Sequence, residues 1–144
     1  AVYGASFGQP SVYARSATGQ WQSFVFDTFA ARQPVSILLD DNGYLWMPLV
    51  SGGIWVFDPV TTRGRLLSTA NGNGGLPDNR VFALAKDKQG QLWAATGRGA
   101  AYFFNPGSVF DNQPFDAIAP IFDGRPVLRD EVVTAIRVDG GNRK

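Results

Sequence analysis

Four arginines stand in segments that the surrounding apolar pattern predicts to be loops: Arg32, Arg80, Arg98 and Arg129. Guanidinium groups that share one face of a protein bind phosphate or carboxylate through paired hydrogen bonds. The alternative is that these side chains cover apolar surface and pair with nearby acids, which is the commoner use of a surface arginine. The sequence therefore offers the four arginines as candidates for an anionic ligand, provided that the fold brings them together.

Aromatic rings are the second kind of candidate binding residue, because an amphipathic ring on a strand can face a groove. Trp55 and Tyr102 are predicted to occupy corresponding strand positions and are the candidates for stacking on a sugar. Trp46 and Trp93 stand at corresponding places in an internal repeat. We expect them to be core residues instead.

Three carboxylates, Asp78, Asp130 and Glu131, also lie in predicted loops. Two acids that converge across a cleft carry out glycoside hydrolysis, so a carbohydrate-active hydrolase or lyase is one hypothesis. Solvated loop charges are the ordinary interpretation. The enzyme hypothesis requires that these acids line one pocket with perturbed pKa values, and we predict no catalytic residue.

The turn at residues 40–43, Asp-Asp-Asn-Gly, superficially resembles a calcium loop because oxygen-bearing side chains precede a glycine. The late acidic ligand of such loops is missing, and the corresponding turn at 87–90 carries Lys88 and Gln89. The glycine-rich stretch at 71–75 lacks the lysine that follows in a phosphate loop. We therefore expect a capped hairpin at 40–43, and neither a metal nor a cofactor.

The composition excludes several classes of chemistry. The 144 residues include no Cys and no His, which removes thiol chemistry, imidazole bases and ordinary zinc sites. The formal charge of +1 gives no overall field that would recruit nucleic acid. No apolar run approaches a membrane span and no signal peptide is visible. The start at Ala1 leads us to expect that the chain was cut from a longer protein.

An internal repeat is the strongest organising feature of the sequence. Residues 34–59 align without a gap onto residues 81–106 at a constant spacing of 47. The recurring positions include Asp40, Gly43 and Trp46, which return as Asp87, Gly90 and Trp93, and Asp139 continues the series after a spacing of 52. Strand-and-turn repeats of this length predict the blades of a β-propeller.

Each repeat reads as short strands punctuated by turn residues. We predict strands at 35–39, 44–48, 53–57 and 65–68 in the first repeat, and at 81–86, 91–95, 100–104 and 115–119 in the second. In each first turn the glycine accepts positive φ and the aspartate carboxylate bonds to backbone N–H groups one or two residues on. Each repeat tryptophan is expected to pack against the neighbouring blade.

The predicted fold is all-β, an incomplete propeller of about three blades made of four-stranded antiparallel sheets. Residues 1–33 would be the back half of a blade, 34–80 and 81–131 two full blades, and 132–144 the first strand of a truncated one. Because four to eight blades normally close a ring, the expectation is a piece of a larger propeller. An oligomer that closes the ring is the less favoured alternative.

The string Leu-Pro-Asp-Asn-Arg-Val at 76–81, followed by Asp87, Gly90, Trp93 and Gly99, resembles the two-component regulator propeller repeat. The first repeat departs from that pattern, with Pro-Leu at 48–49 where the second has Ala-Thr. Its ending at 55–59 and the closing string at 138–144 resemble the PorZ-like surface propellers of the type IX secretion system of Bacteroidota.

The narrower resemblance implies a secreted or cell-surface protein, associated with the outer membrane, that recognises a protein partner or an anionic lipopolysaccharide. It implies no active site. The wider resemblance alone implies the periplasmic oligosaccharide sensor of a hybrid histidine kinase. Our expectation is a non-enzymatic recognition or scaffold module whose ligand lies at the loop face of the blades.

Overall fold

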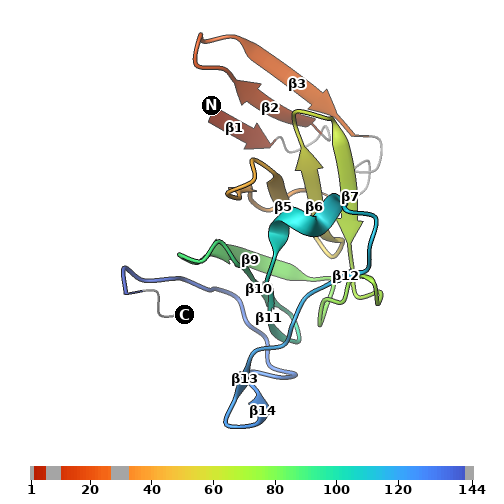
Figure 1. Cartoon of the computed structure of the whole chain (residues 1–144), viewed down its shortest axis with the longest axis vertical. Coiled ribbons are helices and arrows are strands. Elements are labelled where there is room, and N and C mark those ends of the chain that lie inside the picture. The colour runs from red at the N-terminus through yellow and green to blue at the C-terminus, as the bar shows by residue number, and fades with distance from the viewer. Residues whose placement is uncertain (1, 6–10, 27–32, 142–144) are drawn as a thin grey trace.

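The computed structural model describes residues 2–5, 11–26 and 33–141, which form three antiparallel sheets stacked along the longest axis of the molecule (Figure 1). The first sheet contains β1 (Val2–Ala5), β2 (Ser11–Arg15) and β3 (Trp21–Val25). The second contains β4 (Leu38–Leu39), β5 (Leu45–Leu49), β6 (Gly53–Asp58) and β7 (Arg63–Leu67). The third contains β9 (Val81–Lys86), β10 (Leu92–Thr96) and β11 (Gly99–Phe103). This is the predicted all-β architecture of propeller blades.

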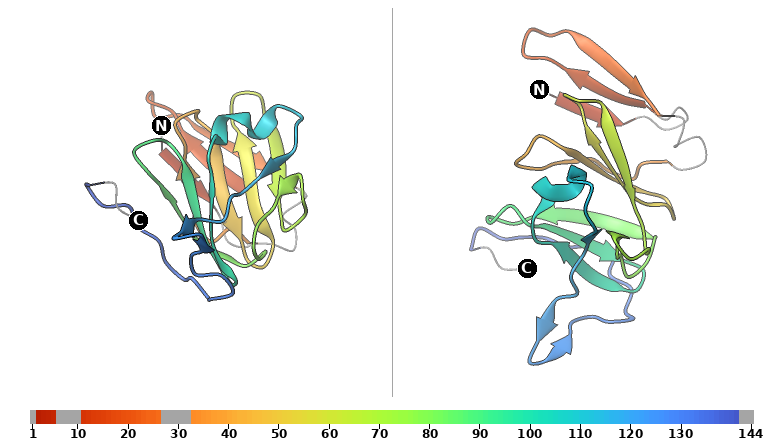
Figure 2. Two further views of the ribbon diagram at one scale, coloured as in Figure 1. Left: turned by 60° about the horizontal axis from the view of Figure 1, so that its bottom comes forward. Right: turned by 45° about the vertical axis from the view of Figure 1, so that its right-hand side comes forward.

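Smaller elements connect and extend these sheets. The 3-10 helix η2 (Pro106–Phe110) follows β11, and β13 (Ile121–Phe122) pairs with β14 (Arg125–Pro126). Between the second and third sheets, β8 (Asn73–Gly74) pairs in parallel with β12 (Phe115–Asp116). Both views of Figure 2 show the segment from η2 to β12 running beside the second and third sheets.

The strand expected at 115–119 is corrected by this pairing. Phe115 and Asp116 join β8 instead of β11, and within that segment only Ile118 bridges the third sheet, opposite Tyr102. The long connection after β11 carries the chain across to the second sheet before it returns. The strand expected at 35–39 is also shorter, since Pro34 makes an isolated bridge to Leu49 and β4 begins only at Leu38.

The two Asp-x-x-Gly turns are built alike. Oδ1 of Asp40 accepts hydrogen bonds from the backbone N–H of residues 42 and 44, at 2.8 and 2.9 Å. Oδ1 of Asp87 does the same for residues 89 and 91, at 3.0 and 2.9 Å. Gly43 and Gly90 have φ of 83° and 79°, a conformation that favours glycine. The bonded N–H groups are thus two and four residues on, where one or two had been expected.

The register of the third strands shows that the repeat is not free of gaps. Leu45 pairs with Phe57, but the corresponding Leu92 pairs with Phe103. The hairpin between β10 and β11 is one residue shorter than that between β5 and β6, so the spacing falls to 46 within the third strand. Phe104, which the ungapped alignment matched to Phe57, is 66% exposed.

The same shift changes the partner of Trp55. Trp55 lies two residues before Phe57, so its counterpart in the third sheet is Ala101 and not Tyr102. Gly53 and Gly99 become the matching hairpin residues, and both have positive φ, 79° and 124°. An added Cβ at either would meet a backbone carbonyl oxygen, at 2.0 and 3.0 Å. Close backbone contact therefore marks the true register.

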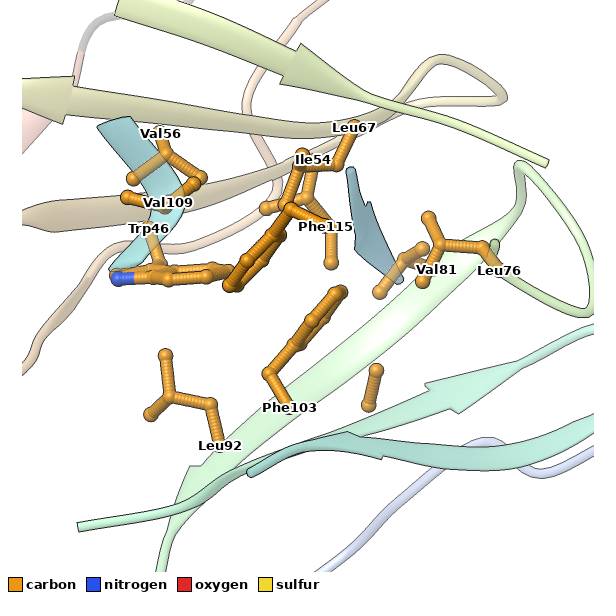
Figure 3. Close-up of a cluster of buried hydrophobic side chains, with 11 residues drawn as sticks. Trp46, Ile54, Val56, Leu67, Leu76, Val81, Leu92, Phe103, Val109 and Phe115 are labelled. Carbon is orange, nitrogen blue, oxygen red and sulfur yellow. The ribbon is translucent and has the colours of Figure 1, made fainter. Parts of the chain in front are cut away.

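The main core fills the gap between the second and third sheets (Figure 3). Trp46 is fully buried and its ring centroid lies 5.2 Å from that of Phe103. Phe103 in turn stacks on Phe115, with centroids 5.1 Å apart. A second cluster fills the gap between the first and second sheets; its buried members are Val12, Leu45, Met47, Leu49 and Phe57.

The helix η2 closes the outer part of the gap between the second and third sheets. Val109 is fully buried in the main core, and Phe110 packs edge-on against Tyr44 at 5.1 Å. Arg65 of β7 donates to the carbonyl oxygens of Val109 and Gly72, at 2.7 and 2.9 Å. One guanidinium group thereby holds both η2 and the segment between β7 and β9, because arginine presents several donors in a rigid fork.

Candidate ligand-binding face

The loops at one end of the sheets form a continuous face. The backbone N–H of Gly97, in the hairpin between β10 and β11, donates to the carbonyl of Arg80 at 3.0 Å. The N–H of Val133 donates to the carbonyl of Thr96 at 2.9 Å. The loop before β9, the hairpin and the segment near residue 130 are thus joined. We call these three segments the arginine face.

Asp78 and Arg80 form a tight pair on this face. Nη2 of Arg80 lies 2.6 Å from Oδ2 of Asp78, and the backbone N–H of Arg80 donates to Oδ1 at 2.8 Å. The hydrogen bond from the Arg80 side chain holds the pKa of the Asp78 carboxyl below its ordinary value, and the charges of Arg80 and Arg98 act in the same direction. Asp78 therefore stays ionised and Arg80 has a fixed partner.

Arg98 and Arg129 share a single carboxylate. Nη2 of Arg98 lies 2.9 Å from Oδ1 of Asp130, and Nε of Arg129 lies 3.7 Å from Oδ2 of the same residue. All three side chains are more than half exposed. This cluster carries an excess of one positive charge, so it leaves donors for a further anion.

A cavity of about 330 Å³ opens beside this cluster. Arg98, Arg129 and Asp130 supply its charged part. Its apolar walls come from Pro77, Ala100, Ala119, Pro126 and Val127. The site therefore combines apolar contact with a positively charged edge, which suits an amphipathic anion.

The structure brings together three of the four predicted arginines. Arg80, Arg98 and Arg129 lie on the arginine face, whereas Arg32 lies outside the described residues. Each of the three has a carboxylate within ion-pair distance. All three arginines therefore pair with acids, and the positive excess is confined to Arg98 and Arg129 around Asp130.

Trp55 and Tyr102 do not form a common platform. Trp55 lies in the gap between the first and second sheets, with its ring centroid 5.9 Å from that of Phe26. Tyr102 lies on the third sheet and stacks on Trp93 at 4.8 Å. The two rings belong to different sheets, and the one-residue shift in the third strand means that they do not occupy equivalent positions either.

The three candidate carboxylates do not all line the cavity on the arginine face. Of Asp78, Asp130 and Glu131, only Asp130 lines the cavity on the arginine face. The lowered pKa of Asp78 makes it unsuited to donate a proton near neutral pH. The convergent acid pair that the hydrolase hypothesis requires is therefore missing from this cavity.

At the opposite end of the sheets, the repeat aspartates serve the turns. Oδ2 of Asp40 accepts from Nε1 of Trp46, and Oδ2 of Asp87 accepts from Nε1 of Trp93. Asp139 repeats the first step of this pattern, since its Oδ1 accepts a hydrogen bond from the N–H of residue 141 at 2.9 Å. The indole bond was missed from the sequence, although the constant Asp-to-Trp spacing of six residues was a usable signal.

Comparison with known proteins supports the repeat. Residues 75–98 match the family model of the two-component regulator propeller. The match runs from the loop before β9, through β9 and β10, to the hairpin that carries Arg98. Among curated proteins none matches the sequence. Within the described residues, no helix is both long and apolar enough to cross a membrane.

A solved structure of PorZ from Porphyromonas gingivalis is similar to 94% of this chain, with 17% identity and a TM-score of 0.41. PorZ is described as an essential bacterial surface component of the type IX secretion system. The chain spans 29% of the length of that PorZ chain.

Proposed function

We propose that this chain is a non-enzymatic recognition module of a bacterial surface protein, and that its arginine face binds an anionic group of a lipopolysaccharide or a partner protein. The observation that carries the proposal is the excess positive charge at Arg98, Arg129 and Asp130 beside an apolar cavity of about 330 Å³. A phosphate or carboxylate placed beside Asp130 would accept hydrogen bonds from the guanidinium N–H groups that Asp130 does not engage.

The surface setting rests on the sequence. The strings at 55–59 and 138–144 resemble the PorZ-like propellers, and this resemblance implies a protein exported to the cell surface. A propeller is a scaffold that hosts unrelated activities, so the ligand must be argued from the site. The arginine face supplies that argument.

The proposal is tested by charge reversal. Arg129→Glu should weaken binding to immobilised lipopolysaccharide by about tenfold or more in a surface-plasmon titration, because a charge-assisted hydrogen bond becomes a repulsion. Arg137→Glu is the matched control, since Arg137 is exposed, lies outside the cavity lining and makes the same change in net charge. Equal affinity of both variants and the unchanged chain would contradict an anion site on this face.

A second candidate function is a periplasmic oligosaccharide sensor, which the family match at 75–98 favours. The two functions differ in the chemistry of the ligand. A neutral oligosaccharide that binds as well to the Arg129→Glu variant as to the unchanged chain would favour the sensor. Loss of binding to an anionic glycolipid in that variant would favour the surface module.

A further inference from the structure

The gap between the second and third sheets is closed at its outer end by residues from η2. A row of paired residues, Trp46, Val56 and Arg65, faces this gap from the second sheet. Val109 is buried in the same cluster as Trp46 and Val56, and Phe110 lies under the guanidinium group of Arg63 at 5.0 Å. An aliphatic and an aromatic side chain, adjacent in sequence, therefore fill the space beside this row.

The first sheet presents the corresponding row to the second sheet. Tyr3 pairs with Ala14, and Ala14 pairs with Gln22. One step further along the same face lie Val12 and Phe24, which belong to the cluster between the first and second sheets. This row therefore corresponds to Trp46, Val56 and Arg65.

The turn between β6 and β7 is too short to supply residues that close the gap between the first and second sheets. The turn between β6 and β7 spans only residues 59–62, whereas the connection after β11 includes η2 and runs to β12 at residue 115. A cavity of about 480 Å³ remains, lined by Tyr3, Ala14, Gln22 and Phe24 and bounded by Pro59 and Val60. Val60 is 89% exposed at its edge. The volume lies in the range of roughly 300–1,000 Å³ that is usual for ligand pockets.

The cavity has one charged lining residue, Arg15. Its guanidinium group lies over the turn at Gly19, since Nη2 is 3.3 Å from the position of a Cβ there. Within the described part of the chain, no carboxylate lies within ion-pair distance of Arg15. The charge at the rim therefore complements an acidic group on whatever enters the cavity.

We propose that this cavity receives a segment of a partner protein that presents an aliphatic and an aromatic side chain followed by a carboxylate. Val109 and Phe110 supply the aliphatic and the aromatic side chain in the neighbouring gap, with Asp111 next in sequence, and they are the internal precedent for the occupant. The aromatic ring would lie between Tyr3 and the turn at Pro59, and the carboxylate would reach Arg15. This surface lies at the opposite end of the sheets from the arginine face and does not depend on the proposed function.

In the experiment, a capped peptide with the sequence of residues 105–113 is titrated into the full chain, and isothermal titration calorimetry measures the heat of binding. We expect saturable binding of one peptide per chain. Replacing the peptide's phenylalanine by alanine should weaken binding by about tenfold or more, because a buried aromatic ring is lost. Gln22→Trp should weaken it by a similar factor, because the indole would occupy the cavity. Ser23→Trp, the next residue on β3 with its side chain on the other face, should leave binding unchanged.

Arg15→Glu provides a test that does not alter the packing of the gap. It should weaken binding of the peptide, and a peptide with lysine in place of the aspartate should recover affinity for this variant alone. Absence of saturable binding to the unchanged chain would overturn the proposal. So would equal binding by Gln22→Trp, since the peptide would then be displacing η2 from the other gap.

Two other occupants give distinct results that also overturn the proposal. A neutral oligosaccharide that binds in a manner sensitive to Gln22→Trp, where the peptide does not, would indicate a sugar site. Concentration-dependent dimerisation in sedimentation, abolished by Gln22→Trp, would indicate that a second copy of the chain fills the cavity.

Discussion

Nε1 of Trp46 donates a hydrogen bond of 2.9 Å to Oδ2 of Asp40, and the carboxylate is buried together with the indole. The same carboxylate holds the turn through its other oxygen. Trp93 and Asp87 repeat the arrangement at 3.0 Å. One aspartate thus ties the first turn of a sheet to the ring that fills the gap to the next sheet.

This bond predicts energetic coupling between Asp40 and Trp46. Asp40→Asn keeps an oxygen for the turn but can place an amide N–H against the indole N–H. Trp46→Phe removes the indole N–H itself. In a double-mutant cycle measured by urea unfolding, we expect a coupling free energy of about 1–2 kcal/mol. Additive losses in the double variant would show that the bond contributes nothing specific.

The two repeat tryptophans should differ in their contribution to stability. Trp46 is fully buried between the second and third sheets, whereas Trp93 is half-buried and stacks on Tyr102 of its own sheet. Trp46→Ala should cost about 3–5 kcal/mol of unfolding free energy, and Trp93→Ala about half as much. Chemical denaturation of the two variants measures this difference, and equal losses would contradict the burial described for them.

Phe103 and Phe104 test the register of the third strand. Phe103 is 1% exposed and stacks on Phe115, whereas Phe104 is 66% exposed. Phe103→Ala should lower the free energy of unfolding by about 3–5 kcal/mol, and Phe104→Ala by less than about 0.5 kcal/mol. A larger loss of unfolding free energy from Phe104→Ala than from Phe103→Ala would contradict this register and favour the ungapped alignment.

Lowering the pH should reduce the contribution of Asp78, on the arginine face, to the stability of the fold. Because the hydrogen bond from Arg80 lowers the pKa of Asp78 below its ordinary value of 3.8, the folded chain holds the carboxyl ionised more firmly than the unfolded chain does. The stabilisation from ionised Asp78 is present above pH 3.8 and is lost as the pH falls through the lower pKa that Asp78 has in the folded chain. Asp78→Asn should therefore be less stable than the unchanged chain at pH 7, and the difference should narrow below pH 3.8. Thermal unfolding across this range measures it, and a difference independent of pH would contradict the assignment.

The sequence by itself determined the class of fold, because short β-prone runs, turn residues and tryptophans recur together at a spacing typical of propeller blades. Asp40, Gly43 and Trp46 have local roles, a capped turn and the ring that follows it, so their pattern could be recognised without coordinates. The loop positions of Arg80 and Arg98 followed from the same pattern.

Only the tertiary structure decided the register of the third strands, since a hairpin shorter by one residue moves every following side chain to the other face of the sheet. It also decided which charges meet. Asp130 lies 32 residues from Arg98, and nothing local in the sequence indicates that they pair. The cavity between the first and second sheets was likewise hidden, because it depends on how far the turn after β6 reaches across to a neighbouring sheet.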